Sequence, residues 1–191
     1  MVGTQMVSKG HHFPDVVLTA VLSADTYLSF PDFRAVEKTY NLLTQVAGRA
    51  GRGERPGRVV IQTYHPEHYA IQAALRHDDS AFSAEEMRFR RMFHYPPYTR
   101  MIQLLLKDSN RTRGEQAMRE LGERIAEHPG AAEIRISGPA AAPFERLRGK
   151  WRFQILLRHR SGRLLRETVA EIMSGQPKRD LVIDVDPHEL L

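Results

Sequence analysis

Hydrophobic and polar residues follow a pattern whose period changes along the first third of the chain. Residues 16–22 and 58–64 are runs rich in β-branched apolar residues, and residues 31–49 between them carry apolar positions three and four apart. A continuous apolar run is typical of a strand buried on both faces of a parallel sheet, and a spacing of three and four is typical of an amphipathic helix. The pattern therefore predicts a strand–helix–strand unit, with Asp25 and the end of the helix near the ligand-binding edge of its sheet.

The remaining two thirds divide at the segment Tyr95-Pro96-Pro97-Tyr98. Two helices are predicted between residues 66 and 93, and the prolines end the second one because proline disfavours helix at the preceding residue. Beyond this point the apolar pattern predicts strand 100–107, helix 112–127, strand 132–137, a long loop 138–150, strand 151–158, helix 163–174 and strand 180–186. This βαββαβ order predicts a four-stranded α+β domain with both helices on one face of the sheet.

Composition limits the classes of protein that remain. The chain has 191 residues, of which 41% are hydrophobic and 27% charged, and this is enough to bury a core. No apolar run approaches the roughly 20 residues of a membrane span, and no secretory pattern is present, so we expect a cytoplasmic protein without a membrane partner. The absence of cysteine excludes disulfides and thiolate metal sites within this chain. A net charge of +5 favours a polyanionic partner.

The octet Gln45-Val46-Ala47-Gly48-Arg49-Ala50-Gly51-Arg52 is the strongest candidate for chemistry. In a helix, Gln45, Arg49 and Arg52 fall on one face, and a guanidinium is a rigid donor fork that matches phosphate oxygens. Gly48 and Gly51 each cost about 1 kcal/mol in a helix interior, which suggests that something approaches the backbone closely. The alternative is a helix C-terminus, where glycine stops the helix and arginine meets the negative dipole end. The residues alone leave both interpretations open.

The octet resembles the Q-x-x-G-R-x-x-R motif of superfamily 2 helicases, and residues 3–16, GTQMVSKGHHFPDV, resemble the motif that precedes it. Together with residues 95–98, 149–154 and 184–187, these motifs resemble one family over the whole chain, the PriA helicases of bacterial replication restart (primosomal replication protein N′). The resemblance implies an α/β fold with three parts: the distal part of a RecA-like second motor lobe (1–64), a helical connector (65–97) and a C-terminal βαββαβ domain (98–191).

The resemblance also implies roles for individual residues. Arg49 and Arg52 would act as catalytic fingers on the terminal phosphate of ATP, Gln45, Gly10 and Gly48 would lie at the nucleotide, and Thr4 and Lys9 would follow the DNA backbone. The chain has no G-x-x-x-x-G-K-[ST] phosphate loop, so ATP and Mg²⁺ are expected to be held mainly by another lobe. The family's zinc-binding, cysteine-rich insertion is expected upstream of Met1.

The segment before the single tryptophan is basic. Arg146, Arg148, Lys150 and Arg152 surround Trp151, and such a loop is typical of a nucleic-acid contact. The alternative is that Trp151 and Phe153 share one strand face and pack under the helices. Both interpretations remain open at this point.

A second basic cluster lies where the strand 151–158 leads into the helix 163–174. It comprises Arg158, Arg160, Arg163 and Arg166, with Leu164, Leu165, Val169 and Ile172 on the apolar side of the same helix. The PriA family binds the acidic tail of single-stranded-DNA-binding protein, so Arg163 and Arg166 beside an exposed apolar edge are a candidate for this contact. The alternative is a solvated patch that faces DNA.

The resemblance implies an ATP-dependent DNA helicase that moves 3′ to 5′, recognises stalled forks and starts primosome assembly. Its expected partners are forked and single-stranded DNA and other primosome proteins. The 191 residues alone are expected to have no ATPase activity. The competing class is a non-catalytic DNA- or protein-binding module with a remnant motor lobe.

Overall fold

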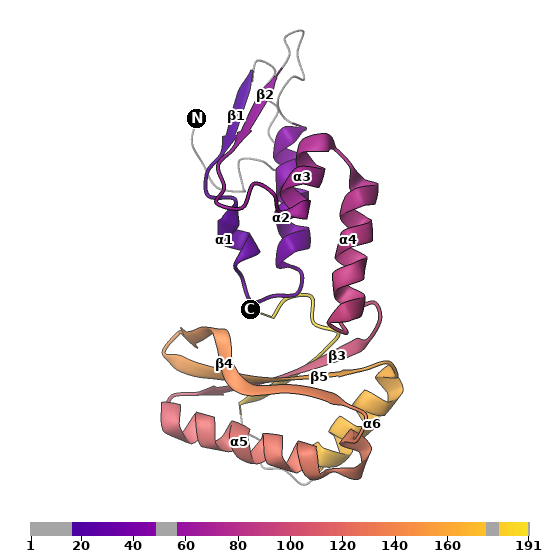
Figure 1. Cartoon of the computed structure of the whole chain (residues 1–191). Coiled ribbons are helices and arrows are strands. Elements are labelled where there is room, and N and C mark those ends of the chain that lie inside the picture. Colours follow the sequence, from indigo (N-terminus) through magenta and orange to yellow (C-terminus); the bar gives the residue numbers. More distant parts are fainter. Residues whose placement is uncertain (1–16, 49–56, 175–179, 191) are drawn as a thin grey trace. The chain divides into compact units, whose positions relative to one another are not determined.

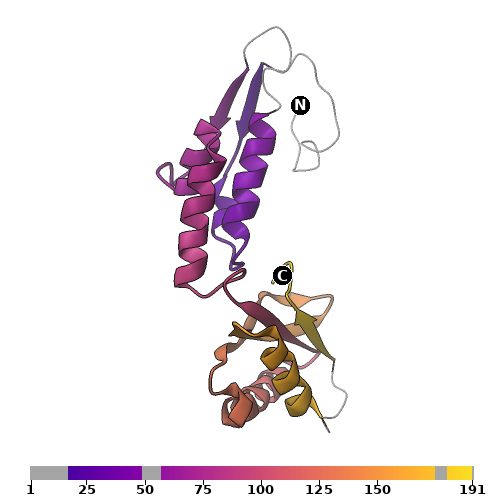
Figure 2. The same ribbon diagram turned by 90° about the vertical axis from the view of Figure 1, so that its right-hand side faces the viewer.

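A computed structural model describes residues 17–48, 57–174 and 180–190 of the chain (Figures 1 and 2). The chain divides into two compact units, Met1–Phe89 and Arg90–Leu191. Each unit has its own cluster of buried hydrophobic side chains.

The first unit contains the predicted strand–helix–strand arrangement. In chain order its elements are β1 (Leu18–Val21), α1 (Asp25–Leu28), α2 (Ala35–Ala47), β2 (Arg58–Ile61), α3 (Tyr69–Arg76) and α4 (Asp79–Met92), whose last turn extends past Phe89. β1 and β2 pair in parallel, with Leu18 opposite Arg58. The prediction of two helices between residues 66 and 93 is also confirmed. The helix of the octet is shorter than predicted, because it begins at Ala35 and ends at Ala47.

The prediction that the first strand is buried on both faces is wrong for the described residues. Leu18 is 58% exposed and Leu22, just after the strand, is 71% exposed. Within the described part of the chain this sheet has only two strands, and α2 packs against β1. A parallel sheet buries its strands when helices cover both of its faces and other strands flank it, and this pair lacks that cover.

The core of the first unit forms between its helices. Tyr40 on α2 stacks on Phe82 of α4, with ring centroids 3.8 Å apart, and Leu43 and Ile71 are buried beside them. The hydroxyl of Tyr40 donates a hydrogen bond to the carboxylate of Asp79. Burial, together with this carboxylate, raises the pKa of Tyr40 to about 12, so the phenol stays protonated.

The second unit has the predicted βαββαβ order. Its elements are β3 (Arg100–Asp108), α5 (Arg111–Glu127), a 3₁₀ turn (Pro129–Ala131), β4 (Arg135–Leu147), β5 (Lys150–His159), α6 (Gly162–Met173) and β6 (Leu181–Val185). The strands form one antiparallel sheet in the order β4-β5-β3-β6. Both helices lie on the same face of this sheet, as predicted (Figures 1 and 2).

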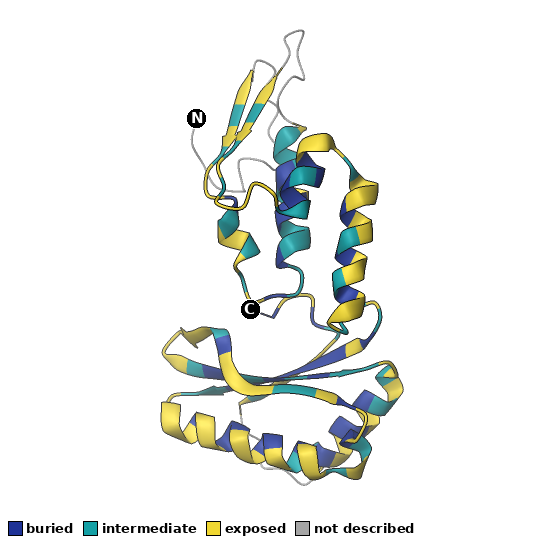
Figure 3. Cartoon of the chain, viewed as in Figure 1, coloured by how far each residue is buried: buried dark blue, intermediate teal, exposed yellow. Residues whose placement is uncertain are grey.

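Strand alternation builds the core of the second unit. Ile102, Leu104 and Leu106 of β3 point to the helices, as do Ile155 and Leu157 of β5, and all five are at most 3% exposed. Met118, Leu121 and Ile125 of α5 and Leu165, Val169 and Ile172 of α6 cover them. Figure 3 shows the buried positions of α5 along its sheet-facing side and the exposed ones along the other.

Residues 138–147 are a strand, so the predicted long loop is wrong. β4 continues to Leu147, and only Arg148 and Gly149 separate it from β5. Pro139 and Pro143 cannot donate to a strand ladder, but β4 is an edge strand, and its pairing with β5 shifts register twice around these prolines. Arg148 and Gly149 have φ angles of 51° and 80°, which the two-residue turn of a tight hairpin requires. We call this structure the β4–β5 hairpin.

Candidate nucleic-acid interface

Basic side chains gather at one end of the four-stranded sheet, where β3 ends, α5 begins and the β4–β5 hairpin turns. Asp108 at the end of β3 pairs with Trp151 of β5, and Trp151 pairs with Arg146 of β4, so the three strands reach this end together. The cations at this end, here called the basic end, are Lys107, Arg111, Arg113, Arg146, Arg148 and Lys150. The predicted basic segment is therefore part of a larger cationic surface.

Trp151 lies in the middle of the basic end. The guanidinium carbons of Arg111 and Arg146 lie 5.0 and 5.4 Å from the centroids of its rings, within the range of cation–π interactions. The tryptophan also packs against the edge of the hydrophobic core, as the packing interpretation expected. Sequence reasoning missed Arg111, because no pattern in the sequence links the first residue of a helix to a hairpin that folds next to it.

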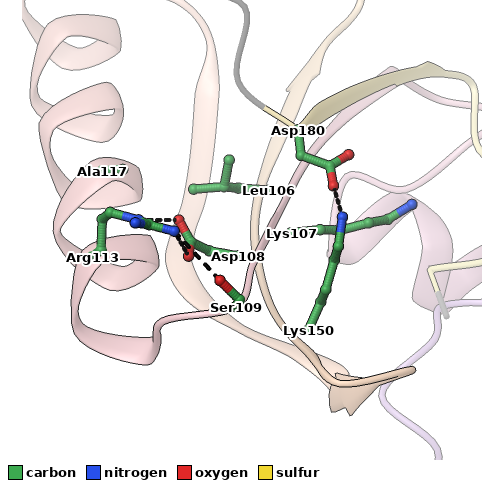
Figure 4. Close-up of a pocket in the computed structure, with 8 residues that line it drawn as sticks. All are labelled: Leu106, Lys107, Asp108, Ser109, Arg113, Ala117, Lys150 and Asp180. Atoms are coloured by element: carbon green, nitrogen blue, oxygen red, sulfur yellow. Dashed lines mark hydrogen bonds and ion pairs between the residues drawn. The ribbon is translucent and has the colours of Figure 1, made fainter.

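Two ion pairs shape a hollow of about 400 Å³ at the basic end (Figure 4). Arg113 donates two hydrogen bonds to the carboxylate of Asp108, with lengths of 2.9 and 2.6 Å, and Lys150 binds the carboxylate of Asp180. The hydrogen bond from Lys150 holds the pKa of Asp180 below its usual value. Lys107 is a third cation in the lining, so the hollow has more positive than negative groups.

Arg152 does not belong to the exposed cations, although it was predicted among them. Its side chain alternates with that of Trp151, it is 4% exposed, and its Nη1 donates to the carbonyl of Phe144 over 3.5 Å. The burial of Arg152 was not visible in the basic sequence pattern. Arg146, Arg148 and Lys150 are exposed, and their contact with nucleic acid stays a prediction.

The apolar residues predicted to form an exposed edge beside Arg163 and Arg166 are buried or half-buried. Leu165, Val169 and Ile172 are at most 8% exposed and belong to the core, because this side of α6 faces the sheet. Arg163 donates to Glu167 over 2.7 Å, and this hydrogen bond raises the pKa of the guanidinium. A contact of Arg163 and Arg166 with an acidic peptide stays a prediction.

Arg158 belongs to the same basic cluster as Arg163 and Arg166, and its contacts stabilise the fold of the second unit. Its Nη1 donates to the carbonyl of Phe93 over 3.0 Å and its Nη2 to the hydroxyl of Ser137 over 2.7 Å. Its guanidinium carbon also lies 4.9 Å from the centroid of the Tyr95 ring. Arg158 therefore ties the proline-rich turn to the sheet.

The predicted nucleotide-side residues are described only in part. Thr4, Lys9, Gly10, Arg49 and Arg52 lie outside the described residues. Gln45 and Gly48 are at the end of α2. Gly48 has an ordinary helical φ of −67°, and a Cβ there would meet the carbonyl of Thr44 at 3.5 Å, so no close approach among the described residues explains this glycine. The alternative interpretation of the octet expected a helix C-terminus at this glycine, and α2 does end at Ala47 with Gly48 as its C-cap.

Asp25 and the end of α2 lie at opposite ends of the β1–β2 pair, contrary to the prediction. The connecting helix runs antiparallel to both strands, so its last turn reaches the amino end of β2, whereas Asp25 follows β1 (Figure 1). The carboxylate of Asp25 accepts hydrogen bonds from the hydroxyl of Thr63 at 2.7 Å and the amide of Tyr64 at 2.9 Å. The bond from Thr63 is the main reason why its pKa is lowered. Asp25 follows β1, and Thr63 and Tyr64 follow β2, so these hydrogen bonds join the carboxyl ends of the two strands. We call this contact the strand clamp.

The described residues contain no group of three or more His, Asp or Glu side chains that could hold a metal ion. No helix in the described ranges has the length and apolarity needed to cross a membrane. What the geometry offers is a cationic, aromatic-centred end of a small antiparallel sheet, which suits a phosphate-bearing partner.

Comparison with known proteins shows the family of this chain. Residues 91–188 match the family described as the primosomal protein N C-terminal domain, and this defines the class of the second unit. The chain is 38% identical to the replication restart protein PriA of Bacillus subtilis and 35% identical to that of Haemophilus influenzae, each over 100% of this chain. It is 38% identical to PriA of Synechocystis over 98% of the chain. The chain belongs to the PriA family of replication restart proteins.

The matches extend over both units, although the chain spans only about a quarter of the relatives it matches. It covers 24% of the length of the Bacillus subtilis protein, 26% of the Haemophilus influenzae protein and 22% of the Synechocystis protein. The three relatives are named as replication restart proteins.

Proposed function

We propose that this chain is part of an ATP-dependent DNA helicase that moves 3′ to 5′, recognises stalled forks and starts primosome assembly with other primosome proteins. The observation that carries the proposal is the match to proteins named replication restart protein PriA over 98–100% of the chain. The match includes the first unit, where the motor residues are predicted, as well as the C-terminal domain.

The first unit would contribute to a RecA-like second motor lobe. Its parallel strand–helix–strand arrangement is the repeating unit of such a lobe, and its exposed apolar strands suit a sheet with further strands. Arg49 and Arg52 would stabilise the charge that develops on the terminal phosphate of ATP, with Gln45, Gly10 and Gly48 nearby and Thr4 and Lys9 on DNA. ATP hydrolysis with Mg²⁺ would supply the energy, and zinc would bind in another part of the longer protein.

Hydrolysis tests the motor part of this proposal. We expect the 191-residue chain alone to show no ATPase activity with DNA and Mg²⁺, because it has no phosphate loop. In a longer protein that contains the chain, Arg52→Ala is expected to reduce turnover about 10³-fold, with a smaller effect on nucleotide affinity. The measurement is steady-state ATPase kinetics, with Arg76→Ala on the exposed side of α3 as the control. Turnover by the short chain would refute the assignment.

The second unit would bind DNA through the basic end. Arg146 and Arg148 are exposed on the β4–β5 hairpin, and Arg111 and Lys150 lie beside them. Affinity for a phosphate backbone falls with salt, with a slope of about −0.9 per neutralised phosphate on a log–log plot. We therefore expect Arg148→Ala/Lys150→Ala to flatten this slope by up to about two units.

The control for this experiment is Arg119→Ala/Arg124→Ala, which removes two cations of α5 away from the hairpin. DNA affinity is measured across a salt series by fluorescence anisotropy. If the control variant flattens the slope as much as the hairpin variant, the contact is not at the basic end.

The alternative function is a non-catalytic DNA- or protein-binding module. The observation in its favour is that the second unit has its own core and carries the basic end by itself. A longer protein that binds forked DNA through this unit but hydrolyses no ATP would establish the alternative.

We also propose that Arg163 and Arg166 bind the acidic tail of single-stranded-DNA-binding protein. Because the adjacent apolar residues of α6 are buried, the contact would depend on charge, and Glu167 would compete with the tail for Arg163. An acidic tail peptide is titrated against the chain and against Arg163→Ala/Arg166→Ala. A loss of up to about tenfold is expected, and identical isotherms would exclude the site.

A further inference from the structure

The β4–β5 hairpin exposes apolar side chains as well as cations. Phe144 is 47% exposed and Leu147 is 52% exposed, and both are on β4, on either side of Arg146. Leu147 is the last residue before the turn and pairs with Lys150. Apolar and positively charged side chains are therefore exposed within the same short arm.

Phosphate contacts alone do not account for these apolar side chains. Lysine and arginine neutralise a phosphate backbone without any apolar neighbour, and in a continuous duplex the faces of the bases are stacked on one another. Single-stranded DNA presents base faces and phosphates side by side, and its binding sites combine cations with apolar or aromatic platforms. The pairing of exposed apolar and basic residues on one arm is what such a strand requires.

We infer that Phe144 and Leu147 contact the faces of unpaired bases while Arg146 and Arg148 bind the neighbouring phosphates. This makes single-stranded DNA the preferred ligand of the hairpin, and it rests on the DNA contact proposed above. Phe144 supplies a ring for stacking, and Leu147 supplies an aliphatic surface of the kind that proteins insert against bases.

The hairpin is held in place before any ligand arrives. Its two central residues have the positive φ angles of a tight turn, Arg146 packs over Trp151, and Lys150 binds Asp180. A rigid platform loses less conformational entropy on binding than a mobile loop. These contacts reduce the conformational freedom of the arm that carries Phe144 and Leu147.

Trp151 makes the inference directly measurable. It is the single tryptophan of the chain, and Arg146 lies 5.4 Å from the centroid of its ring. A phosphate that binds Arg146 changes the surroundings of this ring, so the fluorescence of Trp151 is expected to respond to DNA. Titration of the 191-residue chain then needs no attached dye.

The experiment compares two DNA probes and two substitutions. The probes are an oligothymidine of about 16 nucleotides and a covalently closed duplex without ends. Phe144→Ala/Leu147→Ala is expected to weaken oligothymidine binding about tenfold, with an affinity for the closed duplex that changes less than about twofold. Phe144→Tyr keeps a stacking ring and is expected to retain the wild-type preference, which separates stacking from a folding defect.

Met87→Ala/Met92→Ala is the matched control, because these residues of α4 are also apolar and exposed, at 38% and 54%. Equal weakening on both probes, or none, would overturn the inference while leaving the proposed DNA contact intact. Tighter binding of anionic vesicles than of oligothymidine, lost in Phe144→Ala/Leu147→Ala, would instead assign the arm to a membrane surface and also overturn the inference. A wild-type chain that binds neither DNA probe would refute the proposed DNA contact and the inference together.

Discussion

The two units of this chain use sheets that are covered to very different extents. In the first unit, the two described strands are parallel, and Leu18 of β1 is 58% exposed. In the second unit, four antiparallel strands lie under two helices, and Ile155 of β5 is completely buried. Both strands contain aliphatic residues, which are Leu18, Ala20 and Val21 in β1 and Ile155, Leu156 and Leu157 in β5. The difference shows that tertiary cover, not the composition of a strand, decides how much free energy its apolar residues contribute.

The difference also separates the candidate functions. The second unit buries a continuous core and carries the basic end on a tight hairpin, so a binding surface is available without further protein. The first unit stabilises itself mainly through contacts among its helices and leaves apolar strand residues exposed. That arrangement suits a segment that works together with other parts of a longer protein.

The largest expected effect on the free energy of unfolding comes from truncating one strand residue in each unit, and this tests the comparison. Ile155→Ala is expected to reduce the free energy of unfolding by about 2–5 kcal/mol, because it removes buried methyl groups and leaves a cavity. Leu18→Ala is expected to change it by less than about 0.5 kcal/mol, because Leu18 already contacts water. Chemical denaturation followed by circular dichroism measures both, and similar losses for the two variants would contradict the comparison.

A smaller effect is expected from the hydrogen bond inside the helical core of the first unit. Tyr40→Phe removes the hydroxyl that donates to Asp79 but keeps the ring that stacks on Phe82, so we expect a loss of about 1 kcal/mol. Tyr64→Phe is the control, because Tyr64 is 89% exposed, and its effect is expected to be negligible. Thermal and chemical unfolding measure both variants. A Tyr40→Phe variant as stable as wild type would show that this hydrogen bond does not stabilise the helical core.

The smallest expected effect concerns the clamp at the end of β1 and β2. Hydrogen bonds hold the pKa of Asp25 below its ordinary value of 3.8, so the carboxylate stabilises the folded state above that pH. This contribution is lost as the pH falls through the lower folded-state pKa. The deficit of Asp25→Asn relative to wild type is therefore expected to be largest near neutral pH and to shrink as the pH falls below about 4.

Unfolding midpoints of the Asp25→Asn and wild-type chains are compared over this pH range. Asp78→Asn is a suitable control, because Asp78 caps α4 and has no part in the strand clamp. A deficit that does not change with pH would show that the charge of Asp25 is not what stabilises the clamp.

Local patterns in the sequence determined the order and type of most elements. The βαββαβ order follows from alternating apolar positions in β3 and β5 and from spacings of three and four in α5 and α6, because these periods state which side of each element is buried. The prolines at 96 and 97 placed the end of a helix before them, and α4 ends at Met92. The sequence also indicated the family, because the motifs at residues 3–16 and 45–52 are patterns in the sequence itself.

Only the tertiary structure decided which residues are exposed and which lie together. Arg152 is buried and Arg148 exposed in the same basic segment, because Arg152 lies inside β5 whereas Arg148 lies in the hairpin turn. Arg111 joins Trp151 because helix α5 begins beside the hairpin, and Pro139 is accommodated because β4 is at an edge. Residues distant in sequence supply these surroundings, so no local pattern contains them. A sequence pattern states which side of an element is apolar, but burial and proximity depend on packing with other elements.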